Sequence, residues 1–410
     1  MTGEGSVVTL ITLVKIRGFK SRESKRQDLH CYRRQVGCPL LSIDGWLSAP
    51  ALRDRDADMS AVLSSSIAAS RVARSTPRRR SLPRASSGSD VDARTTSAKM
   101  DKGGESDFGS ILNWRDLGST PGTRVAPGRV FRTATPGRSS EEDAATIVGL
   151  GVARLLDLRS LDEFEPSPGA LQSRFQLRSF TRPADAADPS TGAASTSAAI
   201  AAFRASILDD VDAGRAVRYH APLLDYDRYY RSIYERMEGV ERVKAAVYAV
   251  QAKLYDDTNQ RRLFVRKVNA GGLTLLNEVM VDGSGPAIAA ALCVLSATTP
   301  GGATAFYCKA GKDRTGLVAA LALHCCGASD DAIVADYTRS QGSGKAALGG
   351  GKTEGDGTAI DYSRFHGAPE AIMRDTLSYI RRGYGSVEGY LDRVGFDADA
   401  RRTLARALCE

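Results

Sequence analysis

The most informative absences in this 410-residue chain concern long apolar runs and paired cysteines. No apolar run reaches the ~18–20 residues that a membrane-spanning helix needs, and the apolar stretch 6–16 is too short and lacks a following small-residue cleavage site. We therefore predict no integral membrane segment. The seven cysteines, an odd number at scattered positions, form neither a disulfide framework nor the CxxC pairs of a zinc site. This pattern favours a reducing compartment and predicts no bound metal.

A basic surface is also absent from most of the chain, although the net charge is +8. Residues 1–100 hold 18 Lys and Arg against 9 Asp and Glu, whereas the remaining residues hold 38 against 39. The excess charge thus belongs wholly to the first quarter. Because a nucleic-acid-binding domain keeps its basic stripe on a folded surface, we predict no nucleic-acid partner.

Acidic residues are missing from residues 59–89, which contain ten Ser and six Arg and begin at a methionine. This composition is typical of organelle transit peptides. We therefore interpret residues 1–105 as a disordered leader, with a transit peptide over about 59–95 that directs the protein to a plastid. A plain disordered basic tail, which leaves the protein in the cytoplasm, explains the same composition.

Alternating strand and helix signals begin near residue 111. Ser139 followed by Glu142 predicts a capping box in front of a helix over 143–150, and residues 152–158 form a short buried strand. Further strands are predicted over 216–224 and 303–307, and further helices over 227–237 and 315–325. The alternation predicts an α/β fold with a parallel-rich central sheet flanked by helices, whose ligands bind beyond the carboxyl ends of the strands.

Three stretches interrupt this pattern and are interpreted as insertions in a domain over 106–410. They are the Ala/Ser/Asp-rich segment at about 166–214, a helical segment at about 238–285, and a Gly/Lys-rich loop at 341–358. The last contains GGGKT, but Ala346 occupies the position of the first glycine of a nucleotide-binding loop and no strand precedes it. We therefore interpret this segment as a surface loop.

The segment 303–316, ATAFYCKAGKDRTG, carries the chemistry. A loop between a strand end and a helix start directs backbone N–H groups inward, and the helix N-terminus adds partial positive charge, so residues 309–313 predict an anion cradle. Gly311 permits backbone angles that larger residues resist, and the planar fork of Arg314 can bind two phosphate oxygens. Lys309, Ala310, Gly311, Lys312 and Asp313 are thus the predicted substrate-binding residues.

Cys308 lies at the base of the same positive field, which favours a nucleophilic thiolate at neutral pH. Thr315, at the helix start, is placed to donate a hydrogen bond to the sulfur and to improve it as a leaving group. Cys308, Arg314 and Thr315 are therefore predicted catalytic residues. The alternative interpretation of Cys308 as a small buried apolar residue does not explain the coincidence of strand, glycine, arginine, threonine and helix.

The loop CKAGKDRTG resembles that of the cysteine-dependent protein tyrosine phosphatases, and in particular an atypical family that includes a secreted mycobacterial phosphatase. The upstream blocks LNWRDLG (112–118), APGRVFRT (126–133) and LGVARLLDLRSLDE (150–163) are similar to the opening of that family. The downstream blocks IVADYTRS (333–340) and YGSVEGYLDRVGF (384–396) are similar to its closing helices.

This resemblance implies a dual-specificity-like phosphatase fold and hydrolysis of phosphomonoesters through a phosphocysteine intermediate, without a cofactor. The implied substrates are phosphotyrosine, phosphoserine/threonine or phosphoinositides. The chain departs from the family at Tyr307, where the family loops carry His. This departure supports one alternative, a weak or inactive phosphate-binding module.

A leaving-group oxygen needs a proton, so a carboxylic acid is expected beside the cradle. The resemblance places it just after the strand that follows DLRS, where YHAPLLDYD puts Asp225. Asp227 competes if the alignment slips, and Asp313 competes from within the loop.

Several other residues receive structural interpretations. Asp157 and Arg159 are expected to pair at a strand end. Arg115, Asp116 and Arg132 are expected to form hydrogen bonds in the interior. Cys325 and Cys326 are expected to lie about 15 Å along the helix from the loop, too far to pair with Cys308.

The lysines of the loop leave the substrate class open. Lys309 and Lys312 add two cations to a loop that needs only Arg314 and N–H groups for one phosphate. They therefore fit neighbouring phosphates of a phosphoinositide or inositol phosphate. Alternatively, Lys312 belongs to the family loop whatever the substrate and Lys309 faces solvent, in which case the partner is a phosphorylated protein. The sequence carries no signal for an oligomeric state.

Overall fold

The computed structural model describes residues 108, 110–164, 169–182, 192–224, 226–344 and 359–410. The predicted leader, including the transit segment 59–95, lies outside these residues, as do Asp225 and most of the predicted loop 341–358.

The strands are short and mostly buried. They are β1 (Arg115–Asp116), β2 (Val130–Thr133), β3 (Val152–Asp157), β4 (Gln176–Ser179), β5 (Val217–His220) and β6 (Ala303–Tyr307). The helices up to β6 are η2 (Leu117–Ser119), α4 (Glu141–Gly149), η3 (Leu161–Glu163), η4 (Gln172–Arg174), α5 (Gly192–Asp212), α6 (Tyr226–Glu235), α7 (Gly239–Leu254), α8 (Thr258–Gly283) and α9 (Gly285–Ser296). Those after β6 are α10 (Asp313–Cys325), α11 (Asp330–Thr338), η5 (Tyr362–Phe365), α13 (Glu370–Tyr384), α14 (Val387–Arg393) and α15 (Ala398–Cys409).

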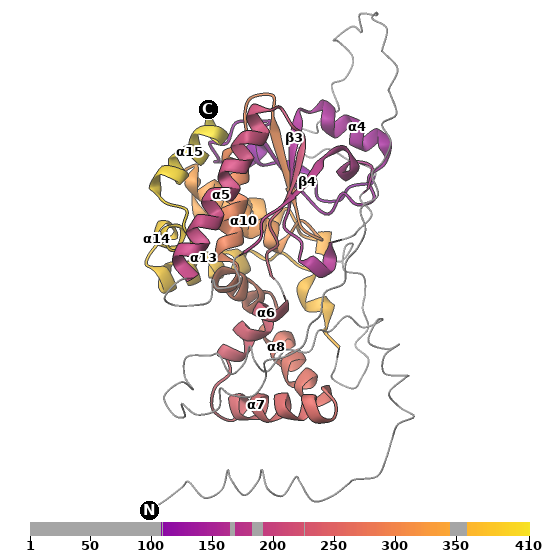
Figure 1. Cartoon of the computed structure of the whole chain (residues 1–410), viewed down its shortest axis with the longest axis vertical. Helices are drawn as coiled ribbons and strands as arrows, with labels where there is room; N and C mark the ends of the chain where they lie inside the picture. Colours follow the sequence, from indigo (N-terminus) through magenta and orange to yellow (C-terminus); the bar gives the residue numbers. More distant parts are fainter. Residues whose placement is uncertain (1–107, 109, 165–168, 183–191, 225, 345–358) are drawn as a thin grey trace, which may run out of the picture. The chain divides into compact units, whose positions relative to one another are not determined.

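Within the described residues the six strands form one sheet in the order β1-β2-β6-β3-β5-β4 (Figure 1). Only β1 pairs in the antiparallel sense, and all other neighbours are parallel. The central strand β6 is buried along its whole length, as expected for a parallel strand covered on both faces. The predicted α/β class with a parallel-rich sheet is confirmed.

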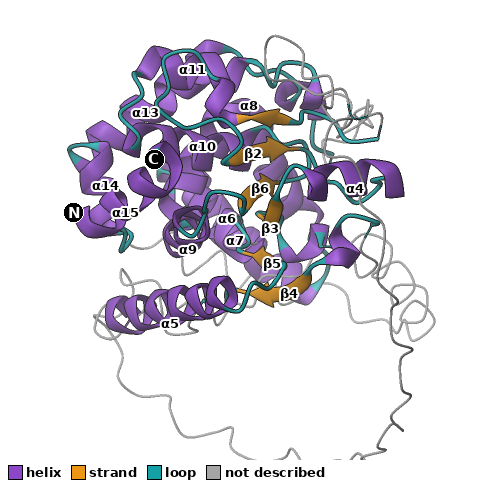
Figure 2. Ribbon diagram, turned by 90° about the horizontal axis from the view of Figure 1, so that it is seen from above, coloured by secondary structure: helices purple, strands orange, loops and turns teal. Residues whose placement is uncertain are grey.

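Helices cover the two faces of this sheet unequally (Figure 2). One face packs against the core formed by α5, α9, α10, α13, α14 and α15, and the other packs against α4 and the segment before β1. Alternate residues of β6 divide between these cores: Tyr307 belongs to the α4 side and Phe306 to the α10 side. Cys308, the next residue, lies on the α10 side.

The carboxyl ends of four strands form one row across the sheet. Thr133 of β2 is in register with Tyr307 of β6, Tyr307 with Asp157 of β3, and Asp157 with His220 of β5. The loop from β6 to α10 leaves from this row. This is the edge at which parallel α/β sheets bind ligands.

Several predicted boundaries differ from those of the structure. The residue that caps α4 is Ser140, whose side chain accepts from the N–H of Asp143, and not Ser139. The hydroxyl of Ser139 instead accepts from the N–H of Leu171, 2.9 Å away, so a tertiary contact decides between two adjacent serines. Strand β5 ends at His220 rather than at residue 224, because Pro222 has no N–H to continue a ladder. Helix α6 runs over 226–235 rather than 227–237.

Two of the predicted insertions contain regular structure. Strand β4, within 166–214, extends the sheet by pairing with β5, and α5 packs on the α10 side. The segment 238–285 is helical, as predicted, and α6, α7 and α8 surround a core that includes Phe264 and Phe365. Helix α8 bends at Gly272, whose φ is +52°. None of the described helices is by itself long and apolar enough to cross a membrane, and α8 and α9 meet those criteria only as a pair bent by 82°.

Candidate active site

The loop that follows β6 runs from Cys308 to Lys312, and α10 begins at Asp313. Cys308 is 2% exposed. Gly311 has a φ of +66°, and a Cβ at this position would lie 2.3 Å from the backbone oxygen of Thr133. Because the end of β2 closes this space with backbone atoms, only glycine fits here.

The carbonyl groups of the loop are held from behind. The side-chain amide of Asn113 donates to the oxygens of Ala310 and Gly311, 3.1 and 2.9 Å away, and Arg132 donates to the oxygen of Gly311 at 2.8 Å. A planar peptide points its N–H away from its own carbonyl oxygen. The N–H groups of Gly311 and Lys312 therefore face the opposite side of the loop.

The N–H groups on that side of the loop have no acceptor in the described part of the chain. The backbone N–H groups of residues 309–312 have no acceptor among the described residues. The first turn of α10 adds further N–H groups without an intrahelical partner, together with the positive end of the helix dipole. This arrangement of unpaired donors around one side of a loop can bind an anion.

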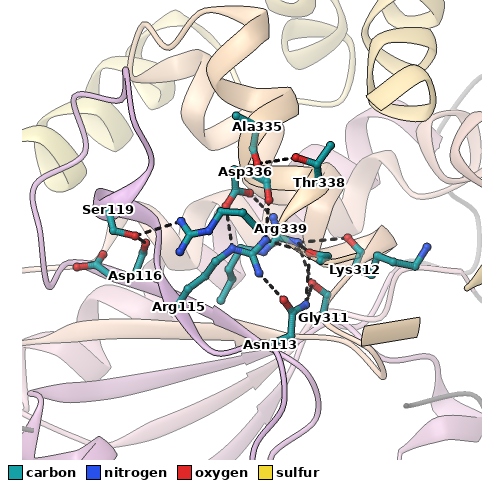
Figure 3. Close-up of polar contacts among 12 residues, drawn as sticks. Asn113, Arg115, Asp116, Ser119, Gly311, Lys312, Ala335, Asp336, Thr338 and Arg339 are labelled. Carbon is teal, nitrogen blue, oxygen red and sulfur yellow. Dashed lines mark hydrogen bonds and ion pairs between the residues drawn. The ribbon is translucent and has the colours of Figure 1, made fainter. Parts of the chain in front are cut away.

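A buried ion network supports the rear of the loop (Figure 3). Asp336 of α11 accepts from Nε of Arg115 at 3.0 Å and also pairs with Arg132, and neither arginine is exposed to solvent. Burial opposes ionisation of Asp336, but the two guanidinium groups outweigh it and lower its pKa to about 2. Arg115 also hydrogen-bonds to Asn113, so the network continues to the loop carbonyls. The predicted interior roles of Arg115 and Arg132 are confirmed.

Asp116 also has the predicted interior role. Its carboxylate accepts from the N–H groups of Gly118 and Gly128, 2.8 and 2.6 Å away. It thereby caps η2 and joins this turn to the segment before β2.

Arg314 forms a two-point ion pair with Glu163 at the end of η3. The contact from Nη2 to Oε1 is 3.0 Å. Burial opposes ionisation of Glu163, but Arg314 and, more weakly, Lys309 hold its pKa below the usual range. Burial would lower the pKa of Arg314, but Glu163 and then the charge of Cys308 raise it above its ordinary value. The guanidinium therefore lies close enough to Cys308 for the two groups to interact electrostatically, and its two-point contact with Glu163 is the geometry that binds a planar oxyanion.

Glu163 is absent from the residues predicted from the sequence. A signal for it was present in Ser160 and Glu163, which have the spacing of a capping box and form one at the start of η3. The capping box sets the position of Glu163, but the sequence gives no sign that the carboxylate then meets Arg314, 151 residues away.

Thr315 is buried in the first turn of α10, and its Oγ1 has no hydrogen-bond partner among the described residues. The predicted hydrogen bond to the sulfur of Cys308 is thus not formed in this structure. A buried hydroxyl without a partner remains available to a group that enters the loop.

The two loop lysines have different surroundings. Lys312 is buried, and its Nζ donates to Asp313 at 2.7 Å and to the backbone oxygen of Gly367 at 2.8 Å. Lys309 is half-buried and forms no ion pair with any described residue. The structure therefore gives Lys312 an internal role and leaves the charge of Lys309 available.

Asp157 and Tyr307 belong to a second buried network, on the other face of the sheet from α10. Asp157 accepts from Arg159 at 2.9 Å, from Arg218 at 2.8 Å and from the hydroxyl of Tyr307 at 3.1 Å. Gln172 in turn donates to that hydroxyl at 2.8 Å. The predicted Asp157–Arg159 pair is confirmed. Tyr307 joins this network, so its side chain points away from Cys308.

Of the three candidate general acids, the structure describes the side chain of Asp313 alone. Asp225 lies outside the described residues, and Asp227 is in α6 without a described side chain. The preceding residue, Leu224, has a φ of +67°, and its N–H donates to the hydroxyl of Ser284 at 3.2 Å. Asp313 already accepts from Lys312 and from Tyr337. This occupancy makes Asp313 a residue that shapes the loop.

Cys325 and Cys326 lie at the end of α10 opposite the loop, as predicted, and line a separate cavity with Cys409. Among the described residues, no group of three or more His, Cys, Asp or Glu is arranged to hold a metal.

Known proteins resemble the chain along most of its length. A sequence model described as the tyrosine phosphatase family matches residues 106–410. A Cupriavidus necator protein described as a tyrosine-protein phosphatase is 27% identical over 298 residues, which cover 69% of this chain and 81% of that protein. The triple specificity protein phosphatase PtpB of Mycobacterium tuberculosis is 27% identical over 232 residues, 56% of this chain and 67% of its own length. The family match includes every strand of the sheet, the loop and α10.

Proposed function

Because the chain belongs to the tyrosine phosphatase family, and is thus a phosphatase of the tyrosine and dual-specificity type, we propose that it hydrolyses phosphomonoesters through a phosphocysteine intermediate on Cys308. One observation carries this proposal. The carbonyls of the loop are bound from behind by Asn113 and Arg132, while the N–H groups of residues 309–312 have no acceptor among the described residues.

In the first step the Cys308 thiolate attacks phosphorus, an S–P bond forms, and the P–O bond to the leaving group breaks. The three remaining phosphate oxygens receive hydrogen bonds from the loop N–H groups, which are in place before the reaction. The leaving oxygen takes a proton from a carboxylic acid. In the second step water attacks phosphorus and gives a proton to the carboxylate formed in the first step, the S–P bond breaks, and Cys308 leaves as the thiolate, with Thr315 as the donor that stabilises it.

Arg314 supplies the remaining charge. In the structure it holds the carboxylate of Glu163 with two hydrogen bonds. A phosphate group offers two oxygens with similar spacing to the same guanidinium nitrogens. We therefore propose that Arg314 releases Glu163 when the substrate binds, and that Glu163 keeps the guanidinium oriented between turnovers.

The central experiment measures turnover of an aryl phosphate by Cys308→Ser, with Cys325→Ser as the matched control at the other end of α10. We expect loss of turnover in the first variant and normal rates in the second. Peroxide should inactivate the wild type and dithiothreitol should restore it, because a thiolate is oxidised reversibly. Turnover by Cys308→Ser would refute the cysteine mechanism, and binding of phosphate without any wild-type turnover would indicate a binding module.

For the general acid we propose Asp225, on the family resemblance alone. Asp225→Asn should slow hydrolysis of alkyl phosphates, whose leaving groups need a proton, much more than that of activated aryl phosphates. Asp227→Asn is the matched control. Equal losses on both substrates in Asp225→Asn would overturn the assignment.

For the substrate we propose phosphotyrosine, together with phosphoserine/threonine or phosphoinositides. The name of the mycobacterial relative states triple specificity for that protein, and Lys309 offers this chain an additional cation beside the cradle. Lys312 is excluded from this role because it is buried against Gly367. Lys309→Ala should reduce hydrolysis of polyphosphorylated inositol phosphates but spare a phosphotyrosine peptide, with Lys267→Ala as the control. Equal effects on both substrates would leave only the protein-phosphatase function.

A further inference from the structure

Helix α7 exposes a row of apolar side chains, here called the α7 stripe. Its members are between 53% and 68% exposed: Val240, Val243, Val247, Val250 and Leu254. They recur at intervals of three and four residues, so the 3.6-residue turn puts them on one side of the helix. Large exposed apolar residues are ordinary when single, but a continuous row of them indicates a binding surface.

The other side of α7 is already occupied. Ala245 and Ala249 are buried, and α7 packs against α8 (Figure 1). Lys267 of α8 also pairs with Glu241 of α7 at 2.9 Å. The stripe is therefore the outward side of a helix whose inward side is fixed.

The charged residues along the two edges of the stripe are basic, although exposed Glu238 and Asp256 lie just beyond the two ends of α7. Lys244 borders the stripe on one side and is exposed without an ion pair among the described residues. Arg242 lies beyond it on the other side, with its guanidinium over the ring of Tyr234. Glu241 is neutralised by Lys267. An apolar helix side bordered by basic residues is typical of helices that lie in the headgroup region of an anionic bilayer.

The same charges argue against two other occupants. If two copies paired along the stripe, Lys244, Gln251 and Ala246 would flank the seam, and these positions offer no acidic partner to a lysine. Residues 1–100 carry 18 basic and 9 acidic residues, a charge that disfavours this segment as the occupant of a surface bordered by lysine.

The helical hairpin of α7 and α8 is connected to the phosphate loop. Asn269 of α8 accepts from the N–H of Asp361 at 2.9 Å, and Phe365 packs in the core of the same helices. The backbone oxygen of Gly367, two residues later, accepts from Lys312 of the loop at 2.8 Å. A surface bound through α7 is thus attached to the loop by a short, hydrogen-bonded segment.

We propose that the α7 stripe docks on membranes that contain anionic lipids. Its valine and leucine side chains enter the boundary between headgroups and acyl chains, and Lys244 contacts lipid phosphates. The proposal rests on the proposed function for its purpose, since docking brings the loop to phosphomonoesters carried in a membrane. The binding itself needs no catalysis.

The test is sedimentation with phosphatidylcholine vesicles prepared with and without phosphatidylserine. The variant is Val243→Glu/Val247→Glu, and the matched control is Val148→Glu/Leu208→Glu, which alters two exposed apolar residues of α4 and α5. The wild type and the control should bind the phosphatidylserine vesicles, more weakly as salt is raised, and the α7 variant should lose at least about tenfold in affinity.

Three results would overturn the proposal: no sedimentation of the wild type, equal sedimentation of the α7 variant, or a wild-type dimer that only the α7 variant dissociates in light scattering. The last would show that a second copy covers the stripe. Turnover of a soluble aryl phosphate is measured on the same samples. Equal rates in all three proteins show intact folding, and absence of turnover in the wild type would refute the phosphatase proposal without altering the sedimentation result.

Discussion

Two arginine–carboxylate pairs lie at the loop between β6 and α10, and they differ in how far their side chains are exposed to solvent. The side chains of Arg132 and Asp336 are 0% and 2% exposed, whereas those of Arg314 and Glu163 are 14% and 26% exposed. Both pairs have the same chemistry, an ionised guanidinium and an ionised carboxylate. What differs is whether water, or a phosphate, can replace one partner.

The surroundings explain the difference. Asp336 pairs with Arg115 as well as with Arg132, and Arg132 also donates to the carbonyl of Gly311. If either Asp336 or Arg132 lost its partner, a buried charge would remain unpaired. The only described carboxylate bound to Arg314 is Glu163, and the pair is partly open. The first pair therefore fixes the shape of the loop, while in the proposed mechanism the second exchanges its carboxylate for substrate.

The largest predicted effect concerns the buried pair. Asp336→Asn should lower the free energy of unfolding by about 3–5 kcal/mol, because it leaves two arginines buried without a counter-charge. Asp331→Asn removes an exposed partner of Arg374 and should cost only ~0–1 kcal/mol. Urea denaturation of both variants measures the change in the free energy of unfolding. Similar losses of stability in the two variants would show that burial of the pair does not determine its contribution.

The second prediction concerns the open pair. Arg314→Lys should reduce kcat/KM on an aryl phosphate by about 10²–10³, since a lysine cannot reproduce the two-point contact with a phosphate. Its stability should change by no more than about 1 kcal/mol, because the pair is partly exposed. Steady-state kinetics and urea denaturation on the same preparation separate the two effects. A large loss of stability with little loss of activity would reverse the roles assigned to the two pairs.

The loop could be predicted from the sequence because its information is local. Cys308 and Gly311 lie between a five-residue buried strand and a helix whose second residue is Arg314, and the structure places all three in that order. The interior positions of Arg115 and Arg132 were predictable through the family blocks that contain them, but their shared partner Asp336 was not predicted.

Other features depend on parts of the chain that meet only after folding. Glu163 pairs with Arg314, 151 residues away in the sequence. The hydroxyl of Ser139 accepts from the N–H of Leu171 and therefore does not cap α4. Lys312 appears in the sequence as a second phosphate-binding cation, but its amine is bound to Gly367, 55 residues away. Strand β4 lies in a segment without clear strand periodicity and forms because β5 offers it an edge.

The third prediction uses pH to distinguish the buried pair. Asp336 has a pKa of about 2 in the folded protein, below the ~3.9 of an unfolded aspartate. A lowered folded-state pKa contributes stability that is fully present above the unfolded value and is lost as pH falls toward 2. Between about pH 4 and pH 2 the wild type should therefore lose stability more steeply than Asp336→Asn, by up to ~1.4 kcal/mol per pH unit. Parallel slopes in denaturation series would contradict the paired state of Asp336.

The smallest predicted effect comes from Glu163→Gln. This change removes the carboxylate that competes with phosphate for Arg314, so inorganic phosphate should inhibit more tightly, by up to about fivefold, in keeping with about 1 kcal/mol for a partly exposed pair. Competitive inhibition assays measure it. Weaker inhibition would mean that Glu163 chiefly orients Arg314.

The most direct test of the account is to trap the intermediate. Rapid acid quench with a ³²P-labelled phosphomonoester, followed by proteolysis and mass spectrometry, should place the label on the sulfur of Cys308 at a rate no slower than turnover. The trapped fraction should increase in Thr315→Ala, because loss of the hydroxyl makes the sulfur a poorer leaving group. Normal turnover with no label on Cys308, or with the label on another residue, would contradict the phosphocysteine mechanism.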